Sequence, residues 1–335
     1  MNTQTPREVG SERLRETMRR DFGPVVMGAL ENPKVVEIML NSNGQIWIEE
    51  FGRGMYRTDV VMKSSHSEKL ISSLASMMGT VITSERPILE GELPLDGSRF
   101  AGLISPVVGA PIFAIRKPAS TVFPLEKYFD DGVLTGKDDP LNRRMRRTTD
   151  FVELCRGKNH LEVLKLAVEH RLSIVVIGGT GSGKTTLVNG VIDMIARLTR
   201  DRLILIEDTK EIQCRAENAV ILRSSEHVDM MRLLRVTLRL RPDRIIVGEV
   251  RGAEALSLLT AWNTGHPGGV ATIHADSALD GLFRLERMMQ QAGVPPDPRV
   301  IASAVNLVVF IDREESISAG RKVREIAFIK GYDAV

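Results

Sequence analysis

The chain has 335 residues, of which 43% are hydrophobic, and this length and composition predict a soluble globular protein of two domains rather than one. Its 45 Lys and Arg residues nearly balance 43 Asp and Glu residues, so the formal charge of +2 excludes a global field that would attract nucleic acid or an acidic membrane. The longest apolar runs are far below the roughly 18 residues that cross a bilayer, and two cysteines exclude a disulfide framework or a four-cysteine zinc site. With no apolar segment near the N-terminus to direct secretion, the sequence predicts a cytoplasmic location.

The first third of the chain predicts a smaller α+β domain, which we place at residues 1–118. Ser42, Asn43 and Gly44 are typical of a tight hairpin turn between two segments rich in apolar residues. In chain order, the predicted elements are a helix at Ser11–Arg20, strands at Val35–Asn41 and Gln45–Glu50, a helix at Ser67–Met78, and strands at Phe100–Val108 and Ile112–Lys117.

Residues 119–150 carry Pro, Gly, Asp and basic residues without a hydrophobic period, which is typical of a linker. The basic run Asn142–Arg147 lies inside this segment. A solvated part of the linker is the favoured interpretation of this run, and a contact with a membrane surface or a partner is the second.

Residues 151–335 show strands that alternate with helices. Helices are predicted at Leu161–His170, Thr186–Leu198, Asp229–Leu240 and Ala253–Asn263, and strands at Ser173–Gly178, Leu203–Glu207, Ala219–Arg223, Arg244–Glu249 and Gly269–His274. This alternation predicts an α/β domain with a mostly parallel sheet covered by helices on both faces, and a final hairpin after Phe310 closes the sheet. A functional site is then expected at the carboxyl ends of the strands.

The segment Gly178–Thr186 has the sequence GGTGSGKTT and matches the pattern GxxxxGK[ST] of a phosphate-binding loop. It follows a predicted buried strand and opens a predicted helix, a position that favours a true phosphate loop over a chance Gly-rich turn. Lys184 is expected to reach the β- and γ-phosphates of ATP, and the Thr185 hydroxyl to ligate Mg²⁺. The predicted nucleotide-binding residues are Gly179, Thr180, Gly181, Ser182, Gly183, Lys184, Thr185 and Thr186.

Acidic residues end two of the predicted strands. The segment IEDTKE supplies Glu207, Asp208 and Glu211, and VGEVRG supplies Glu249. A surface position would explain either group alone, but two acidic groups at the edge that holds the phosphate loop favour catalysis. We assign Glu249 to polarise the Mg²⁺-bound or attacking water and Glu207 to act as general base, and these two roles are interchangeable at this level.

Two histidines lie in the segment Thr264–Ser277. His266 falls in a Gly- and Pro-rich turn, and His274 ends a predicted strand. A single histidine is more often structural than catalytic. Because His274 is expected at the same edge as the phosphate loop, we predict that it senses the γ-phosphate.

Together these motifs resemble those of the secretion and conjugation traffic ATPases, in particular the type IV secretion ATPases and their conjugal-transfer, TrbB-like branch. The resemblance runs from about Val35 to Phe310. It rests on VEIMLNSNGQIWIE and AIRKP in the first domain, the phosphate loop, the acidic box IEDTKEI, the atypical Walker B segment LRLRPDRIIVGEVRG and the histidine box TGHPGGVATIHA.

The resemblance implies a hexameric ATPase with a RecA-like P-loop domain that powers pilus biogenesis or substrate translocation at the cytoplasmic face of the inner membrane. It implies ATP and Mg²⁺ as cofactors, inner-membrane channel proteins as partners, and a peripheral membrane association. In the family, arginines of the first domain approach the phosphates. Arg116 of AIRKP matches that position best, and Arg99 is a weaker candidate.

Four further functions stay open at the level of sequence. A type II secretion ATPase is less favoured because two cysteines cannot build the zinc module usual there. A RecA-like DNA motor or helicase is disfavoured by the near-neutral charge and the 4% aromatic content, which offer few stacking surfaces, so direct nucleic-acid binding stays open. A nucleotide-dependent switch with negligible turnover is the third, and a small-molecule kinase, for which no acceptor-binding lid is evident, is the fourth.

Overall fold

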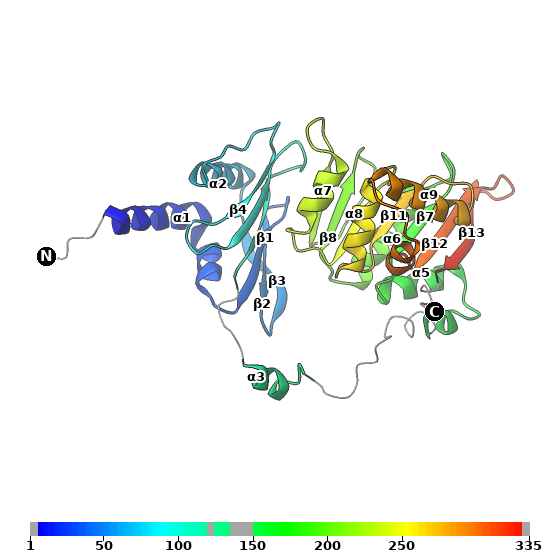
Figure 1. Cartoon of the computed structure of the whole chain (residues 1–335), viewed down its shortest axis with the longest axis horizontal. Helices are drawn as coiled ribbons and strands as arrows, with labels where there is room; N and C mark the ends of the chain where they lie inside the picture. The colour runs from blue at the N-terminus through cyan, green and yellow to red at the C-terminus, as the bar shows by residue number, and fades with distance from the viewer. Residues whose placement is uncertain (1–5, 119–123, 135–149, 330–335) are drawn as a thin grey trace. The chain divides into compact units, whose positions relative to one another are not determined.

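The computed structural model describes residues 6–118, 124–134 and 150–329. The chain forms two compact units, which Figure 1 shows with labels on many of their elements. The first unit comprises Met1–Pro124 with the short segments Ser225–Val228 and Arg239–Arg241, and the second comprises the remainder. Most of the predicted linker at 119–150, including the basic run Asn142–Arg147, lies outside the described residues.

The first unit contains a six-stranded antiparallel sheet of order β3-β2-β1-β6-β5-β4. Its helices α1 and α2 pack against the sheet through a shared apolar core that includes Phe22, Leu74 and Phe113. The elements are α1 (Pro6–Glu31), β1 (Val35–Leu40), β2 (Gln45–Glu50), β3 (Gly54–Val61), α2 (Ser64–Met77), β4 (Ile88–Glu92), β5 (Arg99–Leu103) and β6 (Ile112–Arg116).

The predicted hairpin between β1 and β2 is confirmed. Gly44 has a positive φ of 80° and donates its backbone N–H to the Asn41 carbonyl at 2.9 Å. Other boundaries differ from the predictions. Helix α1 is far longer than Ser11–Arg20 and is kinked at Gly23, whose φ is 73° and which precedes Pro24. The strand predicted at Phe100–Val108 stops at Leu103, and the sequence did not predict β3 or β4.

The second unit contains a seven-stranded sheet of order β13-β12-β7-β11-β10-β8-β9. All neighbouring strands are parallel except β13, which pairs antiparallel with β12 and forms the predicted final hairpin. The strands are β7 (Ile174–Ile177), β8 (Leu203–Glu207), β9 (Ala219–Arg223), β10 (Arg244–Val247), β11 (Val270–Ile273), β12 (Leu307–Arg313) and β13 (Arg321–Phe328). The mostly parallel α/β sheet predicted from the sequence is therefore confirmed.

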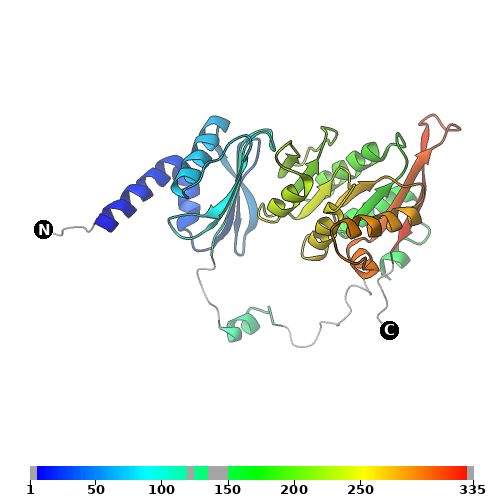
Figure 2. The same cartoon turned by 45° about the horizontal axis from the view of Figure 1, so that its top comes forward.

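Helices cover both faces of this sheet, as Figure 2 shows from a second direction. Residues Val168 of α5 and Ile192 of α6 lie in one apolar core with alternate residues of the strands, such as Val176. The opposite face is covered by α7 to α10. All four residues of β7 are buried, because both faces of the strand are covered. The helices are α3 (Leu125–Asp130), α5 (His160–Glu169), α6 (Lys184–Leu198), α7 (Met230–Thr237), α8 (Glu254–Asn263), α9 (Ala278–Gln291) and α10 (Pro298–Ala304).

None of the helices in the described part of the chain combines the length and the apolar character needed to span a lipid bilayer.

Candidate functional site

The phosphate-loop motif lies between β7 and α6, as predicted. Gly181 and Gly183 have φ values of 73° and 94°, a backbone region in which side chains are strained. Helix α6 begins at Lys184, directly after Gly183. The loop therefore directs the positive end of a helix and its backbone N–H groups toward one place, which is the arrangement that binds phosphate.

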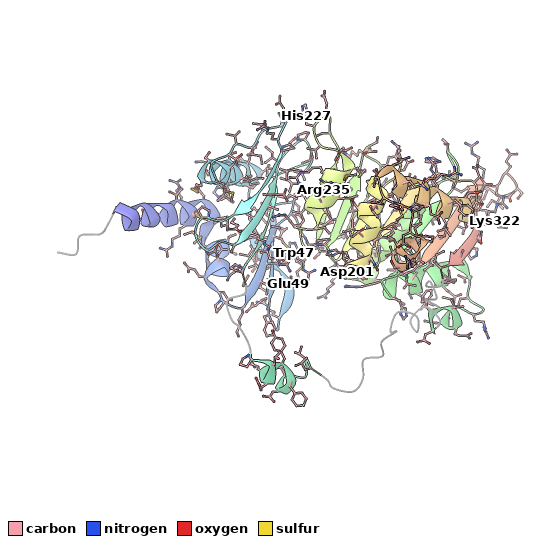
Figure 3. All side chains as sticks on the ribbon, viewed as in Figure 1. Trp47, Glu49, Asp201, His227, Arg235 and Lys322 are labelled. Atoms are coloured by element: carbon pink, nitrogen blue, oxygen red, sulfur yellow. The ribbon has the colours of Figure 1, made fainter. Side chains whose placement is uncertain are left out.

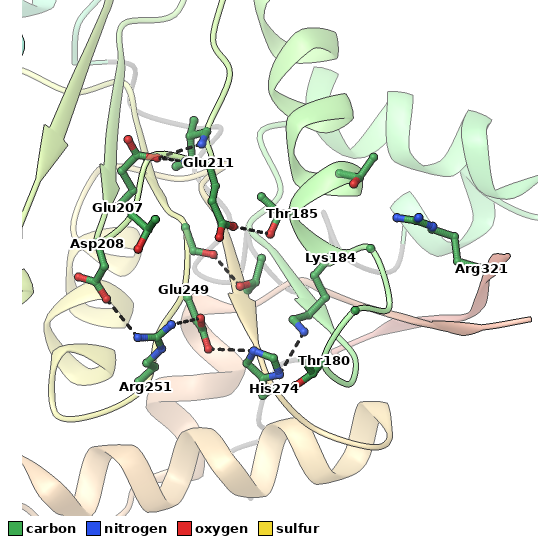
Figure 4. A pocket seen from close by; sticks show the side chains of 17 residues that line it. Thr180, Lys184, Thr185, Glu207, Asp208, Glu211, Glu249, Arg251, His274 and Arg321 are labelled. Atoms are coloured by element: carbon green, nitrogen blue, oxygen red, sulfur yellow. Dashed lines mark hydrogen bonds and ion pairs between the residues drawn. The ribbon is translucent and has the colours of Figure 1, made fainter. Parts of the chain in front are cut away.

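A cavity of about 540 Å³ opens beside this loop at the carboxyl edge of the sheet (Figure 4). Of the predicted nucleotide-binding residues, Thr180, Gly181, Gly183, Lys184, Thr185 and Thr186 line it. The predicted acids and histidine Glu207, Glu249 and His274 line it too. Gly179 and Ser182 form the loop itself: the Gly179 carbonyl accepts a hydrogen bond from Lys184, and Ser182 is buried.

Lys184, His274 and Glu249 form a continuous polar chain across the cavity (Figure 4). The Lys184 amino group lies 3.2 Å from Nδ1 of His274, and Nε2 of His274 lies 3.1 Å from Oε1 of Glu249. Since a lysine ammonium only donates, Nδ1 is the acceptor and Nε2 carries the proton that faces Glu249. The other Glu249 oxygen accepts a hydrogen bond of 2.6 Å from Arg251, which also lies 3.5 Å from Asp208.

The pKa values along this chain favour a neutral histidine. Burial, followed by the positive charge of Lys184, lowers the pKa of His274 below its ordinary value, and Glu249 opposes this only in part. Burial also lowers the pKa of Lys184. For Glu249, burial acts most strongly and raises the pKa, but the Arg251 hydrogen bond and the charges of Arg251 and Lys184, joined by that of His274 once it is protonated, outweigh burial and leave the pKa lowered. These shifts favour a carboxylate at Glu249 and a neutral imidazole at His274.

Glu207 is held differently from Glu249. Its side chain is almost fully buried at the end of β8. One carboxylate oxygen accepts the backbone N–H groups of Glu211 and Ile212, both at 2.9 Å, and the other accepts a hydrogen bond from Arg223 at 2.8 Å. Glu207 thus fastens the segment that follows β8 to the sheet.

The segment that Glu207 holds reaches the start of α6. The Thr185 hydroxyl, the predicted Mg²⁺ ligand, donates to Oε2 of Glu211 at 3.0 Å. Asn189, one turn further along α6, donates to the Glu211 carbonyl at 3.1 Å. A hydroxyl and a carboxylate are therefore adjacent at the mouth of the phosphate loop.

These residues fit Mg²⁺ and a nucleoside triphosphate. The cavity volume lies within the range of roughly 300–1,000 Å³ found for small-molecule sites. Mg²⁺ prefers oxygen ligands and in nucleotide sites takes one or two from the protein and others from phosphate and water. Thr185 and Glu211 supply such oxygens. Among the described ranges, no three His, Cys, Asp or Glu side chains gather into a metal-binding cluster, and this mode of binding needs none.

Arg116 and Arg99 belong to the first unit, where they lie directly opposite each other on β6 and β5. Arg116 is 3.2 Å from the buried carboxylate of Glu37, and 61% of its side chain is exposed. The cavity described above is formed by residues of the second unit. A contact of either arginine with phosphate therefore remains a prediction.

The sequence assigned no individual role to four charged residues of the cavity: Asp208, Glu211, Arg251 and Arg321. Glu211 and Arg251 lie inside the two acidic segments, so their nearness to Glu207 and Glu249 was an available signal. Arg321 begins β13, in a hairpin for which the sequence suggested no chemistry. The hairpin brings Arg321 to the phosphate loop, a placement that depends on strand order rather than on any local pattern.

Comparison with known proteins identifies the family. Residues 143–318, more than half of the chain, match the family model described as "Type II/IV secretion system protein". The conjugal transfer protein TrbB of Rhizobium radiobacter is 44% identical over 96% of this chain and 91% of its own length. The chain belongs to the type IV secretion traffic ATPases.

Other members of the type IV secretion traffic ATPases are similar to the chain over most of its length. The type IV secretion system protein PtlH of Bordetella pertussis is 32% identical over 91% of this chain and 93% of its own. The crystal structure of the VirB11 ATPase from the Brucella suis type IV secretion system matches with a TM-score of 0.82 and 27% identity, covering 94% of this chain and 97% of that one. This VirB11 ATPase thus shares the α/β fold described above.

Proposed function

We propose that this chain is a hexameric, RecA-like motor that hydrolyses ATP with Mg²⁺ to power conjugal transfer or type IV secretion at the cytoplasmic face of the inner membrane. The observation that carries the proposal is the chain Lys184–His274–Glu249 across a cavity beside the phosphate loop. Support for the biological setting comes from the relatives, which are named for conjugal transfer and type IV secretion.

The phosphate loop and Lys184 bind the phosphates of ATP. The Lys184 ammonium donates to the carbonyls of Gly178 and Gly179, both at 2.8 Å. The side chain therefore lies along the phosphate loop, in the place where it would contact bound phosphate. Thr185, with Glu211 beside it, would hold Mg²⁺, which when bound supplies positive charge against the phosphate oxygens.

Glu249 orients and deprotonates the attacking water in this proposal. Its lowered pKa keeps it a carboxylate, and its hydrogen-bond partners leave it beside the cavity rather than in the core. His274 holds Glu249 through Nε2–H and at the same time contacts Lys184, so it links the group that activates water to the group that binds phosphate. Glu207, whose oxygens are occupied by two backbone N–H groups and Arg223, acts as the anchor of the Glu211 segment rather than as the base.

The remaining parts of the proposal concern assembly. Arg116 of the first domain, with Arg99 as the weaker candidate, would place a guanidinium on the phosphates, a contribution on the order of 10³–10⁵ in rate where such arginines are known. The domains are proposed as 1–118 and 151–335, joined by the linker 119–150. Channel proteins of the inner membrane are the proposed partners, with peripheral membrane association.

The replacement Lys184→Ala tests this function. Phosphate release from Mg-ATP by the purified chain should fall about 100-fold or more, because a cation that stabilises transferring phosphate is lost. In the same preparation, the wild-type chain with Mg-ATP should have a mass about six times its 37.1 kDa. Unchanged turnover in the variant would overturn the proposed chemistry, and a monomer at all nucleotide concentrations would overturn the proposed assembly.

A further inference from the structure

The hairpin of β12 and β13 lies beside the phosphate loop. In the parallel pairing of β12 with β7, Phe310 lies opposite Ile177, the last residue of β7. Strand β12 continues to Arg313, so its last residues run beside the loop that follows β7. The antiparallel register then places Arg321, the first residue of β13, directly opposite Arg313.

Both arginines approach the loop closely. Nη2 of Arg313 donates to the Thr180 carbonyl at 3.3 Å. A β-carbon added to Gly181 would lie 2.6 Å from Nη2 of Arg313, and one added to Gly183 would lie 2.5 Å from Cδ of Arg321. Arg321 also lines the cavity. The hairpin therefore brings two guanidinium groups to the glycines of the phosphate loop.

The charge of this pair is not balanced within the described part of the chain. There, no carboxylate lies within ion-pair distance of either Arg313 or Arg321, whereas Arg324 on the same hairpin lies 2.8 Å from Glu314. The Arg321 side chain donates a hydrogen bond to the Ala319 carbonyl, at 3.3 Å. Like charges directly opposite on paired strands are unfavourable. A bound anion between them and the loop would offset that cost.

The position of Arg321 indicates which part of a nucleotide it meets. In Figure 4, Arg321 lies on one side of Lys184, and Glu249 and His274 lie on the other. Glu249 and His274 mark the end at which the terminal phosphate is hydrolysed. A guanidinium on the far side of Lys184 is therefore directed at the nucleoside end of the phosphate chain.

We propose that Arg321 binds the α-phosphate of a nucleoside di- or triphosphate, while Arg313 keeps the phosphate loop against the hairpin. The inference rests on the proposed nucleotide site. It adds to that site a phosphate-binding residue from outside the segment that matches the family model, which ends at residue 318. Because ADP and ATP share the α-phosphate, Arg321 strengthens the binding of both to the same extent.

The test compares Arg321→Ala with Lys322→Ala. Lys322, labelled in Figure 3, is the next residue of β13 and is exposed. Because successive residues of a strand face opposite sides, the control removes the same charge from the other face of the same strand. Dissociation constants for ADP and for a non-hydrolysable ATP analogue are measured with Mg²⁺. We expect both to rise about tenfold in Arg321→Ala, because a hydrogen bond to a charged group is lost, and to stay within twofold of wild type in Lys322→Ala.

Two results would overturn the inference: unchanged affinity of Arg321→Ala for ADP, or weakened binding of the analogue alone, which would place Arg321 at the γ-phosphate. If the alanine variant does not fold, Arg321→Gln keeps an N–H donor near the position of the Arg321 Nε for the Ala319 carbonyl while it removes the charge, and the same criteria apply. Titration of the wild-type chain beside the Arg321 variants separates the two proposals. A wild-type chain that binds neither nucleotide defeats the nucleotide site itself, whereas wild-type affinity in the Arg321 variants defeats only the role of Arg321.

Discussion

His274 connects Lys184 and Glu249, the two charged groups on which the proposed hydrolysis depends. It accepts from Lys184 through Nδ1 and faces Glu249 with Nε2–H, which only the neutral imidazole can do. Burial and the neighbouring ammonium lower its pKa, so the neutral form persists below the ordinary histidine value of 6.5. The imidazole therefore keeps this geometry throughout the neutral pH range.

The pH dependence of turnover should report His274. As the pH falls through the lowered pKa of His274, the imidazole gains a proton, Nδ1 no longer accepts from Lys184, and activity declines. The acid limb of the rate profile should therefore lie below pH 6.5. In His274→Gln this limb should move to a lower pH, because the next group to protonate is the Glu249 carboxylate, which Arg251 and Lys184 still stabilise.

His266→Gln is the matched control for this profile. Its ring hydrogen-bonds to the Pro242 carbonyl at 2.9 Å and does not line the cavity, so its profile should follow that of the wild type. An acid limb at or above pH 6.5, or one that is the same in His274→Gln, would contradict the role given to His274.

The two glutamates show what sequence could and could not predict at this scale. The sequence placed Glu207 and Glu249 at one edge of the sheet, and both line the cavity. Which of them can act as a base depends on partners that are distant in the chain. Arg223 of β9 and the backbone of Ile212 occupy Glu207, whereas His274 of the β11 end holds Glu249 beside the cavity. The residues next to each glutamate in the sequence therefore do not indicate which of the two is free to act as a base.

Among the elements, the strands that carry the site were the most predictable. Strands β7, β8 and β10 are short runs of apolar residues buried on both faces, and the motifs follow them directly. Strand β3 was not predicted because all of its residues are exposed or half-buried, so its sequence lacks an apolar alternation. Helix α9 was missed although its buried residues, among them Gly281, Leu285 and Met288, follow a helical period that could have been recognised.

A network of buried charges holds the opposite, amino-terminal ends of these strands. Arg244 opens β10 and is almost fully buried; it donates to Asp201 at 2.6 Å and to the carbonyls of Val168 and Gly268. Asp201, labelled in Figure 3, also pairs with Arg171. This network connects α5, β10 and the loop before β11 at the end of the sheet opposite to the site.

Removing one partner of this network should be costly. In Asp201→Ala, the buried Arg244 charge loses its carboxylate, and the free energy of unfolding should fall by about 3–5 kcal/mol in denaturant titrations. The control is Asp193→Ala, which breaks an exposed pair with Arg197 four residues along α6 and should cost less than about 1 kcal/mol. Equal effects of the two replacements would contradict the structural role of the buried network.

At the scale of the whole molecule, the family is the firmest result. Both the match over residues 143–318 and the 44% identity to a conjugal transfer protein agree with the resemblance seen in the sequence motifs. The predictions that involve more than one unit or more than one copy of the chain are not tested by this family assignment. Arg116 lies in the first unit, paired with Glu37, and the role proposed for it would require the two units and several copies of the chain to act together. Sequence motifs indicate such an assembly only through the family.

The central claim is that Glu249 activates water for ATP hydrolysis in a site that binds ATP without its help. Its most direct test is single-turnover hydrolysis of Mg-ATP by Glu249→Gln, with ATP binding measured on the same sample. The account predicts binding close to that of the wild type and hydrolysis slower by about 10²–10⁴-fold, the contribution of a general base. Hydrolysis at the wild-type rate by a Glu249→Gln variant that binds ATP normally would contradict it.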